Sequence, residues 1–325
     1  MLPAVNFFDA RFTSLRGYLD ERFGRTERQL DALASVERRI AADAEATLEL
    51  ASLNGEMAAW LKDQTARIPG VAAAESARSY VGKQLDAVDE GLAELLNYAN
   101  SHKGFAAQAG LWFNPPVSLN YEPGQVHVGS VNERIAEVPY VFRALDGIGP
   151  GGHILDFGCA ESTVSLSLAA LGYKVTALDL HPYPLAHPGI TMVAQPAESW
   201  DGPEEKFDAI VCLSTLEHAG LGWYGENESA QDLDRVILER MLSWLAPSGR
   251  LIFTAPFGIW SVSDFERRYD DEHLEVLFSG WKVLDRQVAL QRSDKLWELV
   301  PGFQSSAASP SDNAVIMLQA TPASI

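Results

Sequence analysis

His153-Ile-Leu-Asp-Phe-Gly-Cys-Ala-Glu-Ser162 is the stretch of this sequence that says most about its fold. Its first five residues form a short apolar run typical of a buried strand, and Gly158 ends the run. A helix is predicted to begin near Ser162. In an open parallel sheet, ligands bind beyond the carboxyl ends of the strands, and glycine permits a close approach to the backbone. We therefore expect a ligand site at this turn, beside Asp156, where backbone amides favour an anionic group.

The chain beyond this turn alternates between predicted strands and predicted helices. Apolar runs of strand length are separated by amphipathic stretches, which predicts crossover connections and a mostly parallel sheet. A long polar loop over 291–312 joins the last two predicted strands, which favours an antiparallel hairpin at one edge. The predicted strands are 153–157, 174–178, 190–193, 207–212, 250–254, 281–288 and 314–319, and the predicted helices are 132–145, 162–171, 232–245 and 271–278.

Asp179 stands at the end of the second predicted strand, 23 residues after Asp156. The two aspartates are therefore expected at neighbouring tips of one sheet. A carboxylate at the second position can accept hydrogen bonds from both hydroxyls of a ribose.

The part of the chain before residue 131 differs in pattern. Apolar positions recur at spacings of three and four over 9–68 and again over 72–100, which predicts a helical domain over 1–102. The pattern leaves open a coiled-coil oligomerisation arm or a helical hairpin packed on its own domain. Residues 103–130 are rich in proline and glycine and are predicted to form a linker or lid before a third region, 131–325. The aromatic residues of 103–130 are expected either to cover a pocket or to join the domains.

Composition restricts the functions that the chain can have. The 325 residues correspond to about two domains, and 47% hydrophobic and 21% charged residues are typical of an ordered protein. A net charge of −19 argues against a nucleic-acid partner. No secretory signal or membrane span is predicted, and two cysteines do not form a disulfide framework. We therefore expect a cytoplasmic protein.

Five ordered motifs resemble those of the class I S-adenosylmethionine-dependent methyltransferases. They are Leu155–Cys159, the acid Asp179, Phe207–Cys212, Leu216-Glu217-His218 and Leu245–Leu251. The resemblance covers about half of the chain. It implies a doubly wound, seven-stranded, mostly parallel α/β sheet of the Rossmann-like methyltransferase kind, which binds S-adenosyl-L-methionine across the tips of strands one, two and four.

The same resemblance assigns residues to the cofactor. Gly158, Cys159 and Ala160 would lie under the methionine moiety, with Asp156 organising the turn, although two of the three family glycines are replaced here. Pro196 stands where the family has an acid facing adenine, so other groups are expected to substitute for it. The remaining implied contacts are Asp179 and Leu180 at the ribose, Ala197 and Glu198 near adenine, and Leu213 and Ser214 beside the cofactor.

The residues that bind the methyl acceptor are predicted to follow the fourth predicted strand, 207–212. His218 can act as a general base for a hydroxyl acceptor, and Glu217 can orient its ring or bind substrate. The alternative is that Glu217-His218 only forms a turn common in the family. Trp223 and Tyr224 offer flat surfaces suited to a sugar or aromatic acceptor. No spacing of acidic residues in the following loop is diagnostic of a metal site, and none is predicted.

A looser resemblance suggests the acceptor class. Residues 131–143, the turn after Gly158 and the loop after His218 resemble a bacterial subgroup associated with glycan or secondary-metabolite assembly. It favours O-methylation of a sugar or other small polar acceptor. One alternative is N- or C-methylation of a small metabolite. Another is an inactive scaffold that binds partners. A homo-oligomer formed through the N-terminal helices is also considered. Arg134 either approaches the cofactor carboxylate or pairs with Glu133 or Glu137.

Overall fold

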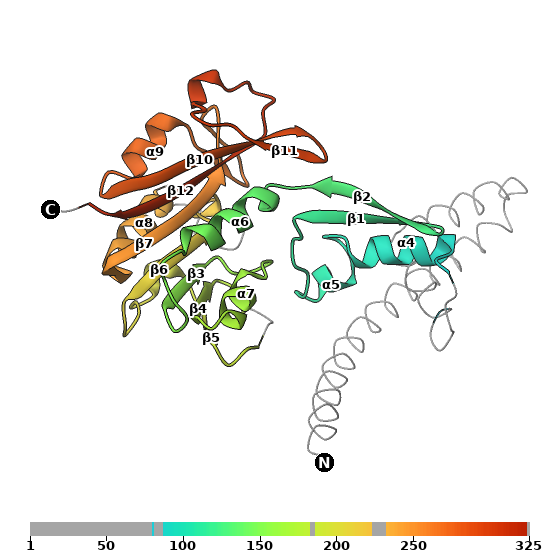
Figure 1. Ribbon diagram of the computed structural model, residues 1–325, viewed down its shortest axis with the longest axis horizontal. Coiled ribbons are helices and arrows are strands. Elements are labelled where there is room, and N and C mark those ends of the chain that lie inside the picture. The colour runs from blue at the N-terminus through green and yellow to red at the C-terminus, as the bar shows by residue number, and fades with distance from the viewer. Residues whose placement is uncertain (1–79, 81–86, 183–185, 223–231, 324–325) are drawn as a thin grey trace, which may run out of the picture. The chain divides into compact units, whose positions relative to one another are not determined.

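An eight-stranded sheet dominates the residues described by this computed structural model, which are Tyr80, 87–182, 186–222 and 232–323 (Figure 1). The strand order is β11-β10-β12-β7-β6-β3-β4-β5. Neighbouring strands from β5 to β7 are parallel, whereas β12, β10 and β11 join antiparallel. The strands are β3 (His153–Phe157), β4 (Lys174–Asp179), β5 (Ile190–Ala194), β6 (Phe207–Leu213), β7 (Leu245–Pro256), β10 (Trp281–Ser293), β11 (Leu296–Leu299) and β12 (Ala314–Pro322).

This architecture confirms the predicted α/β class and the mostly parallel sheet. One detail of the prediction is wrong, because the sheet has eight strands and not seven. The extra strand, β11, lies inside the segment 291–312 that was expected to be loop, and it pairs with β10 at the sheet edge. Its four residues Leu-Trp-Glu-Leu are too few to show a clear period of two, so the sequence pattern did not reveal it.

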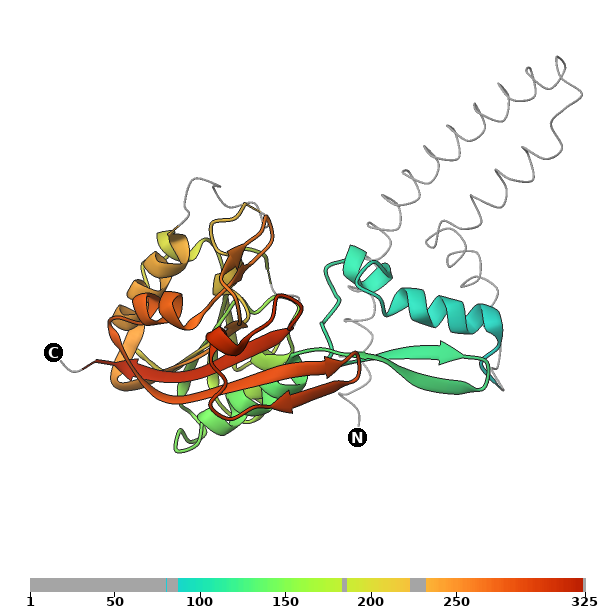
Figure 2. The same cartoon turned by 90° about the horizontal axis from the view of Figure 1, so that it is seen from above.

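Helices cover both faces of the sheet, and two buried clusters lie beneath them (Figure 2). Helices α6 (Arg134–Ala144) and α7 (Val164–Ala170) pack over one cluster, and α8 (Leu233–Trp244) and α9 (Asp271–Leu277) pack over the other. Apolar strand residues point alternately into the two clusters, as expected for a sheet buried on both faces. Helix α6 runs through Pro139, where the sequence predicted an interruption or a kink.

Residues 87–131 form regular structure, whereas 103–130 were expected to be a loop. Helix α4 (Glu90–Ala99) and the short helix α5 (Phe105–Gln108) precede an antiparallel hairpin of β1 (Val117–Glu122) and β2 (Gln125–Val131). Gly124 has a φ of 73°, which the tight turn between the strands requires. Of the residues that suggested a linker, Pro115 and Pro116 therefore precede the hairpin, and Pro123 and Gly124 form its turn.

Helix α4 packs on this hairpin through the side chain of Asn97. Its amide donates to the Tyr121 carbonyl at 2.8 Å and accepts from the Tyr121 N–H at 2.7 Å, as a neighbouring strand would. The chain divides into two units, Met1–Val71 and Ala72–Ile325, so α4 groups with the hairpin and the sheet. The predicted helix 9–68 and residues 72–79 and 81–86 of the second predicted helix lie outside the described residues, whereas α4 lies in the rest of that second helix. The oligomerisation arm stays a prediction.

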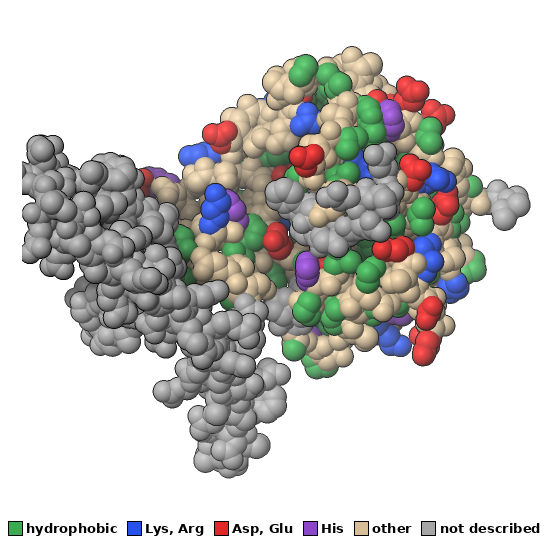
Figure 3. All heavy atoms as spheres, turned by 180° about the vertical axis from the view of Figure 1, so that it is seen from behind, with side chains coloured by type: hydrophobic (Ala, Val, Ile, Leu, Met, Phe, Trp, Pro, Cys, Tyr) green, Lys and Arg blue, Asp and Glu red, His purple; other side chains and the backbone are tan. Residues whose placement is uncertain are grey.

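The surface carries charges of both signs. On the face seen in Figure 3, acidic and basic side chains are interspersed over the sheet region. Within the part of the chain that the structure describes, no helix is both long enough and apolar enough to span a membrane.

Candidate active site

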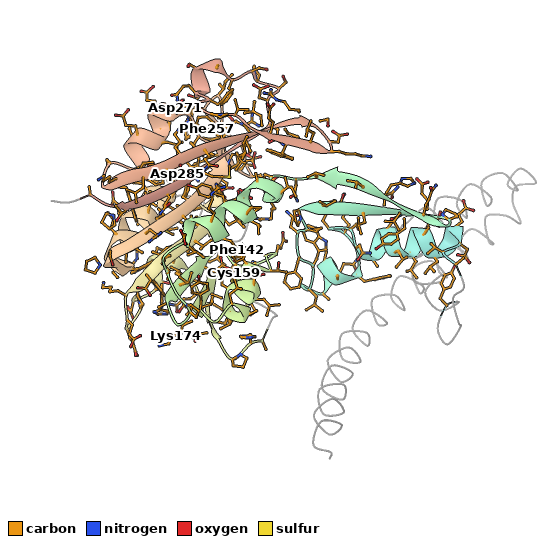
Figure 4. All side chains as sticks on the ribbon, in the orientation of Figure 1. Phe142, Cys159, Lys174, Phe257, Asp271 and Asp285 are labelled. Carbon is orange, nitrogen blue, oxygen red and sulfur yellow. The ribbon has the colours of Figure 1, made fainter. Side chains whose placement is uncertain are left out.

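A cavity of about 560 Å³ lies beyond the carboxyl ends of the parallel strands. Its lining includes residues that follow β3, β4 and β6 directly, such as Gly158, Leu180 and Ser214. Lys174 begins β4 and Cys159 follows β3, and Figure 4 shows them toward opposite ends of the strands. The cavity is therefore at the edge of the sheet where ligands of open α/β folds bind.

The turn after β3 needs glycine for a reason that the sequence did not reveal. Gly158 has a φ of 73°, and a Cβ built on it would lie 2.2 Å from two side-chain atoms of Thr215. The Thr215 hydroxyl is itself fixed, since it donates to the carbonyls of Phe157 and Leu213 at 3.3 and 3.1 Å. The glycine thus lets the turn after β3 pass close to the turn after β6.

Asp179 is one of the carboxylates that line the cavity. Its Oδ2 accepts the Ala160 N–H at 2.9 Å, and its Oδ1 accepts the His181 N–H at 3.0 Å. The side chain therefore joins the turns after β3 and β4. Each carboxylate oxygen has a second lone pair, so Asp179 keeps the capacity to accept hydrogen bonds from a ligand.

Asp156 is buried beneath the turn and is not among the lining residues. Its Oδ2 accepts the Ser165 hydroxyl at 2.6 Å, which ties β3 to helix α7. Burial raises the pKa of Asp156 to about 6, although the Ser165 hydrogen bond acts in the opposite direction. The predicted role of Asp156 in organising the turn stays a prediction, because its observed partner lies in α7. Two further predicted cofactor residues, Cys159 and Leu213, are also buried outside the lining.

The other predicted cofactor residues do line the cavity. Pro196 precedes a short 3-10 helix, Ala197–Ser199, which brings the first two of its residues to the cavity wall. Gln195 lines the same wall and was not singled out from the sequence. The predicted residues found in the lining are Gly158, Ala160, Asp179, Leu180, Ala197, Glu198 and Ser214.

His218 lines the cavity and lies in a short 3-10 helix after β6, Leu216–His218. Its Nδ1 is 2.6 Å from the carbonyl oxygen of Phe265. A carbonyl only accepts, so Nδ1 carries the proton and Nε2 is the basic nitrogen of the neutral ring. Phe265 belongs to the turn between two short strands, β8 (Ser261–Val262) and β9 (Arg267–Arg268), so this turn fixes the histidine tautomer.

Glu217 is almost fully buried and lines the cavity. Its Oε1 is 3.9 Å from His218 Nε2, and its Oε2 has no hydrogen-bond partner among the described residues. Burial raises the pKa of the Glu217 carboxyl well above its ordinary value. A neutral carboxyl group both donates and accepts, so it can bind a ligand hydroxyl in either sense.

A second buried acid, Glu137, joins helix α6 to the strand ends. Its Oε1 accepts from the hydroxyls of Ser214 and Thr254 at 2.6 and 2.7 Å. Its Oε2 lies 3.6 Å from Nη1 of Arg134, so the expected pairing of Arg134 with a nearby glutamate is observed. Nε and Nη1 of Arg134 have no hydrogen-bond partner among the described residues. The sequence offered Glu137 only as a partner of Arg134 and did not indicate its contacts with β6 and β7.

The far wall of the cavity comes from segments that the sequence analysis left unassigned. Trp297 of β11 lines it and donates its indole N–H to the Val131 carbonyl at 2.8 Å. Asn114, Phe265 and Asn313 also contribute. The presence of a tryptophan, Trp297, inside the polar segment 291–312 was the one feature of the sequence that could have indicated this part of the cavity wall. The predicted acceptor residues Trp223 and Tyr224 lie outside the described residues.

Comparison with known proteins finds a family match within the part of the chain that forms the sheet. Residues 133–291 match a protein-family model described as a methyltransferase domain. No curated protein matches the chain in sequence.

Solved structures provide weaker likenesses. The 1,6-didemethyltoxoflavin-N1-methyltransferase of Burkholderia thailandensis, solved with 1,6-didemethyltoxoflavin and S-adenosylhomocysteine, is 18% identical with a TM-score of 0.42, over 59% of this chain and 80% of that one. The N-methyltransferase NodS of Bradyrhizobium japonicum WM9, solved with S-adenosylhomocysteine, is 17% identical with a TM-score of 0.41, over 59% and 88%. A methyltransferase-like protein of Bacillus halodurans is 11% identical with a TM-score of 0.43, over 58% and 100%.

The doubly wound sheet, the cavity at its carboxyl edge and the acid after β4 define a Rossmann-like enzyme of the nucleoside-cofactor type. Residues 133–291, just under half of the chain, match a methyltransferase domain of the class I S-adenosylmethionine-dependent kind, whose cofactor is S-adenosylmethionine.

Proposed function

We propose that this methyltransferase transfers a methyl group to the oxygen of a sugar or other small polar acceptor. The observation that carries the proposal is His218, which lines the cavity with its basic nitrogen set by the Phe265 carbonyl. A hydroxyl is a weak nucleophile that must lose a proton during transfer, so an O-acceptor needs a base of this kind.

The lining also fits the cofactor. Asp179 supplies carboxylate oxygens suited to ribose hydroxyls, and the unsatisfied Nε and Nη1 of Arg134 suit a carboxylate. Ala197 and Glu198 supply the wall at which the adenine would lie. The bound cofactor provides a methyl group on a sulfonium, which is already a strong electrophile.

The proton and the bonds of the transfer balance as follows. The acceptor oxygen forms a bond to the methyl carbon while the bond from that carbon to sulfur breaks, which leaves S-adenosylhomocysteine. Nε2 of His218 takes the hydroxyl proton and later passes it to water. The Glu217 carboxyl, whose pKa burial raises, lies 3.9 Å from Nε2 and is placed to hydrogen-bond the same or a neighbouring hydroxyl and so to orient the acceptor.

The atom that receives the methyl group tests this proposal. The full chain would be incubated with cofactor labelled with ¹³C at the methyl group and with a panel of monosaccharides and phenols, and products would be examined by NMR. We expect label at the chemical shift of an O-methyl group, and loss of this signal in His218→Gln. Label on nitrogen or carbon of any acceptor, or full turnover by His218→Gln, would contradict the proposal.

A further inference from the structure

A second concave site lies in the part of the chain that precedes the sheet. A groove of about 1230 Å³ runs between helices α4 and α5 and the β1–β2 hairpin, and Lys295 also contributes to it. It is distinct from the catalytic cavity, because the methyltransferase motifs do not contribute to its lining. No step of the proposed transfer uses it.

The groove combines polar and apolar surface and carries few charges. Among its described lining residues, only Glu122 and Lys295 carry a full charge at neutral pH, although 21% of the chain is charged. Its lining contains six amide side chains and three serine hydroxyls, together with Trp112, Tyr121 and eight other apolar side chains. The amides are Asn97, Asn100, Asn114, Asn120, Gln125 and Asn132. Such a lining offers donors, acceptors and flat apolar faces to an uncharged, hydroxyl-rich ligand.

Internal hydrogen bonds hold the walls of the groove in place. Asn97 binds both backbone groups of Tyr121, and the Trp112 indole N–H donates to the Asn100 carbonyl at 3.1 Å. These contacts fix helix α4, the hairpin and the segment between them relative to one another. Asn120 and His102 are exposed lining residues whose side chains make no hydrogen bond within the described residues, so they have free capacity for a ligand.

Asn114 connects the groove to the catalytic cavity, because it lines both. Its backbone N–H donates to the Glu161 carbonyl at 2.8 Å, and its Oδ1 accepts from the amide of Asn132 at 2.8 Å. The preceding residue, Phe113, packs against Cys159 and Ala177 beneath the turn after β3. The end of the groove is therefore attached to the wall of the cavity where the methyl group is transferred.

We propose that this groove binds the extended part of an oligosaccharide acceptor, whose terminal sugar enters the catalytic cavity past Asn114. The inference rests on the proposed O-methylation of a sugar. A nucleic acid or a phosphorylated chain is disfavoured, because Lys295 is the only full positive charge among the described lining residues. An oligosaccharide uses both properties of the lining, since its hydroxyls pair with amides and its ring faces pack on aromatic side chains.

Binding of defined oligosaccharides tests the groove. The probes are mono- and tetrasaccharides of glucose, galactose, mannose, rhamnose and N-acetylglucosamine, titrated by calorimetry into the full chain with S-adenosylhomocysteine present. We expect at least one tetrasaccharide to bind about tenfold more tightly than its monosaccharide. The double variant His102→Ala, Asn120→Ala should lose about that factor while keeping its affinity for S-adenosylhomocysteine. Val126→Ala is the matched control, since Val126 is exposed on the same hairpin but does not line the groove.

The outcomes separate this inference from the proposed function. Three results would overturn the proposal that the groove binds an oligosaccharide. They are equal affinity for mono- and tetrasaccharides, no binding of any of these probes, and undiminished binding by the double variant. Methylation of a monosaccharide with the same kcat/KM as its tetrasaccharide would also overturn it while leaving O-methylation intact. Tetrasaccharide binding that depends on His102 and Asn120, with label transferred only to nitrogen, would support the groove and refute the proposed O-methylation.

Discussion

The two walls of the catalytic cavity are built by different means. The cofactor wall consists of two short turns, and Asp179 joins them through the backbone N–H groups of Ala160 and His181. A second wall, which carries the proposed base, consists of side chains from distant segments, including buried Glu217 and partly buried His218, whose ring the Phe265 carbonyl fixes. The contrast suggests different roles for the two walls. The first holds its ligand-facing side chain, Asp179, through backbone N–H groups. The second affects protonation, because burial raises the pKa of Glu217 and a hydrogen bond sets the tautomer of His218.

The largest effect is expected from removing the proposed base on the second wall. His218→Gln should lower kcat for an O-acceptor by about 10²- to 10⁴-fold, the usual contribution of general base catalysis. The affinity for S-adenosylhomocysteine, measured by calorimetry, should not change. The wild-type enzyme should lose activity towards acid pH as the ring takes up a proton, and this limb should be absent from the variant. A variant with an unchanged pH–rate profile would show that His218 is not the base.

The complementary change is on the cofactor wall. Asp179→Ala should weaken the binding of S-adenosylhomocysteine by about 10- to 100-fold, because hydrogen bonds to a charged group contribute about 1.5–3 kcal/mol. Turnover at saturating cofactor should fall much less. Asp208→Ala is a matched control, since Asp208 accepts the His153 N–H at 2.8 Å from the far end of the strands. If both variants lose the same affinity, Asp179 acts only through folding.

A third experiment asks whether Glu217 is neutral. Its raised pKa means that the folded protein holds this proton more tightly than the unfolded chain does. The resulting stability is present at low pH and is lost as pH rises through the folded pKa, with a slope of at most about 1.4 kcal/mol per pH unit. Glu217→Gln removes the ionisation, so denaturant unfolding should show the variant gaining stability relative to wild type as pH rises.

The control for this comparison is Glu275→Gln, on an exposed face of α9. It should follow the wild-type pH dependence. An unfolding free energy that falls with pH equally in wild type and in Glu217→Gln would mean that Glu217 is ionised in the folded protein.

The smallest effect is expected at the rim of the second wall. Trp297→Leu replaces an indole that lines the cavity and donates to Val131, and it should raise the KM for the acceptor by about 3- to 10-fold. The KM for S-adenosylmethionine should be unchanged. Leu296→Ala, an exposed neighbour on the same strand, serves as the control and should leave both constants as they are.

The two walls also differ in how far sequence could predict them. The cofactor wall follows from local patterns, because Gly158 and Asp179 each end an apolar run of strand length. Trp297, Phe265 and Asn114 reach the cavity only through tertiary contacts, which no local period encodes. The hairpin β1–β2 was missed for a related reason, since its strands are largely exposed and lack a clear apolar alternation.

Glu137 shows a further limit of the sequence. It lies on an amphipathic helix among other charged residues, and nothing in that pattern marks it as fully buried. Its burial becomes understandable only once the hydroxyls of Ser214 and Thr254 are found beside it.

The contact between Gly158 and Thr215 has a consequence for engineering this enzyme. A methyl group at position 158 would occupy space that Thr215 already fills, so the two positions cannot be varied independently. A library that randomises the first loop alone will yield mostly misfolded clones, whereas one that also admits glycine or alanine at 215 opens variants otherwise inaccessible. Redesign for cofactor analogues should therefore vary positions 158 and 215 together and select for both at once.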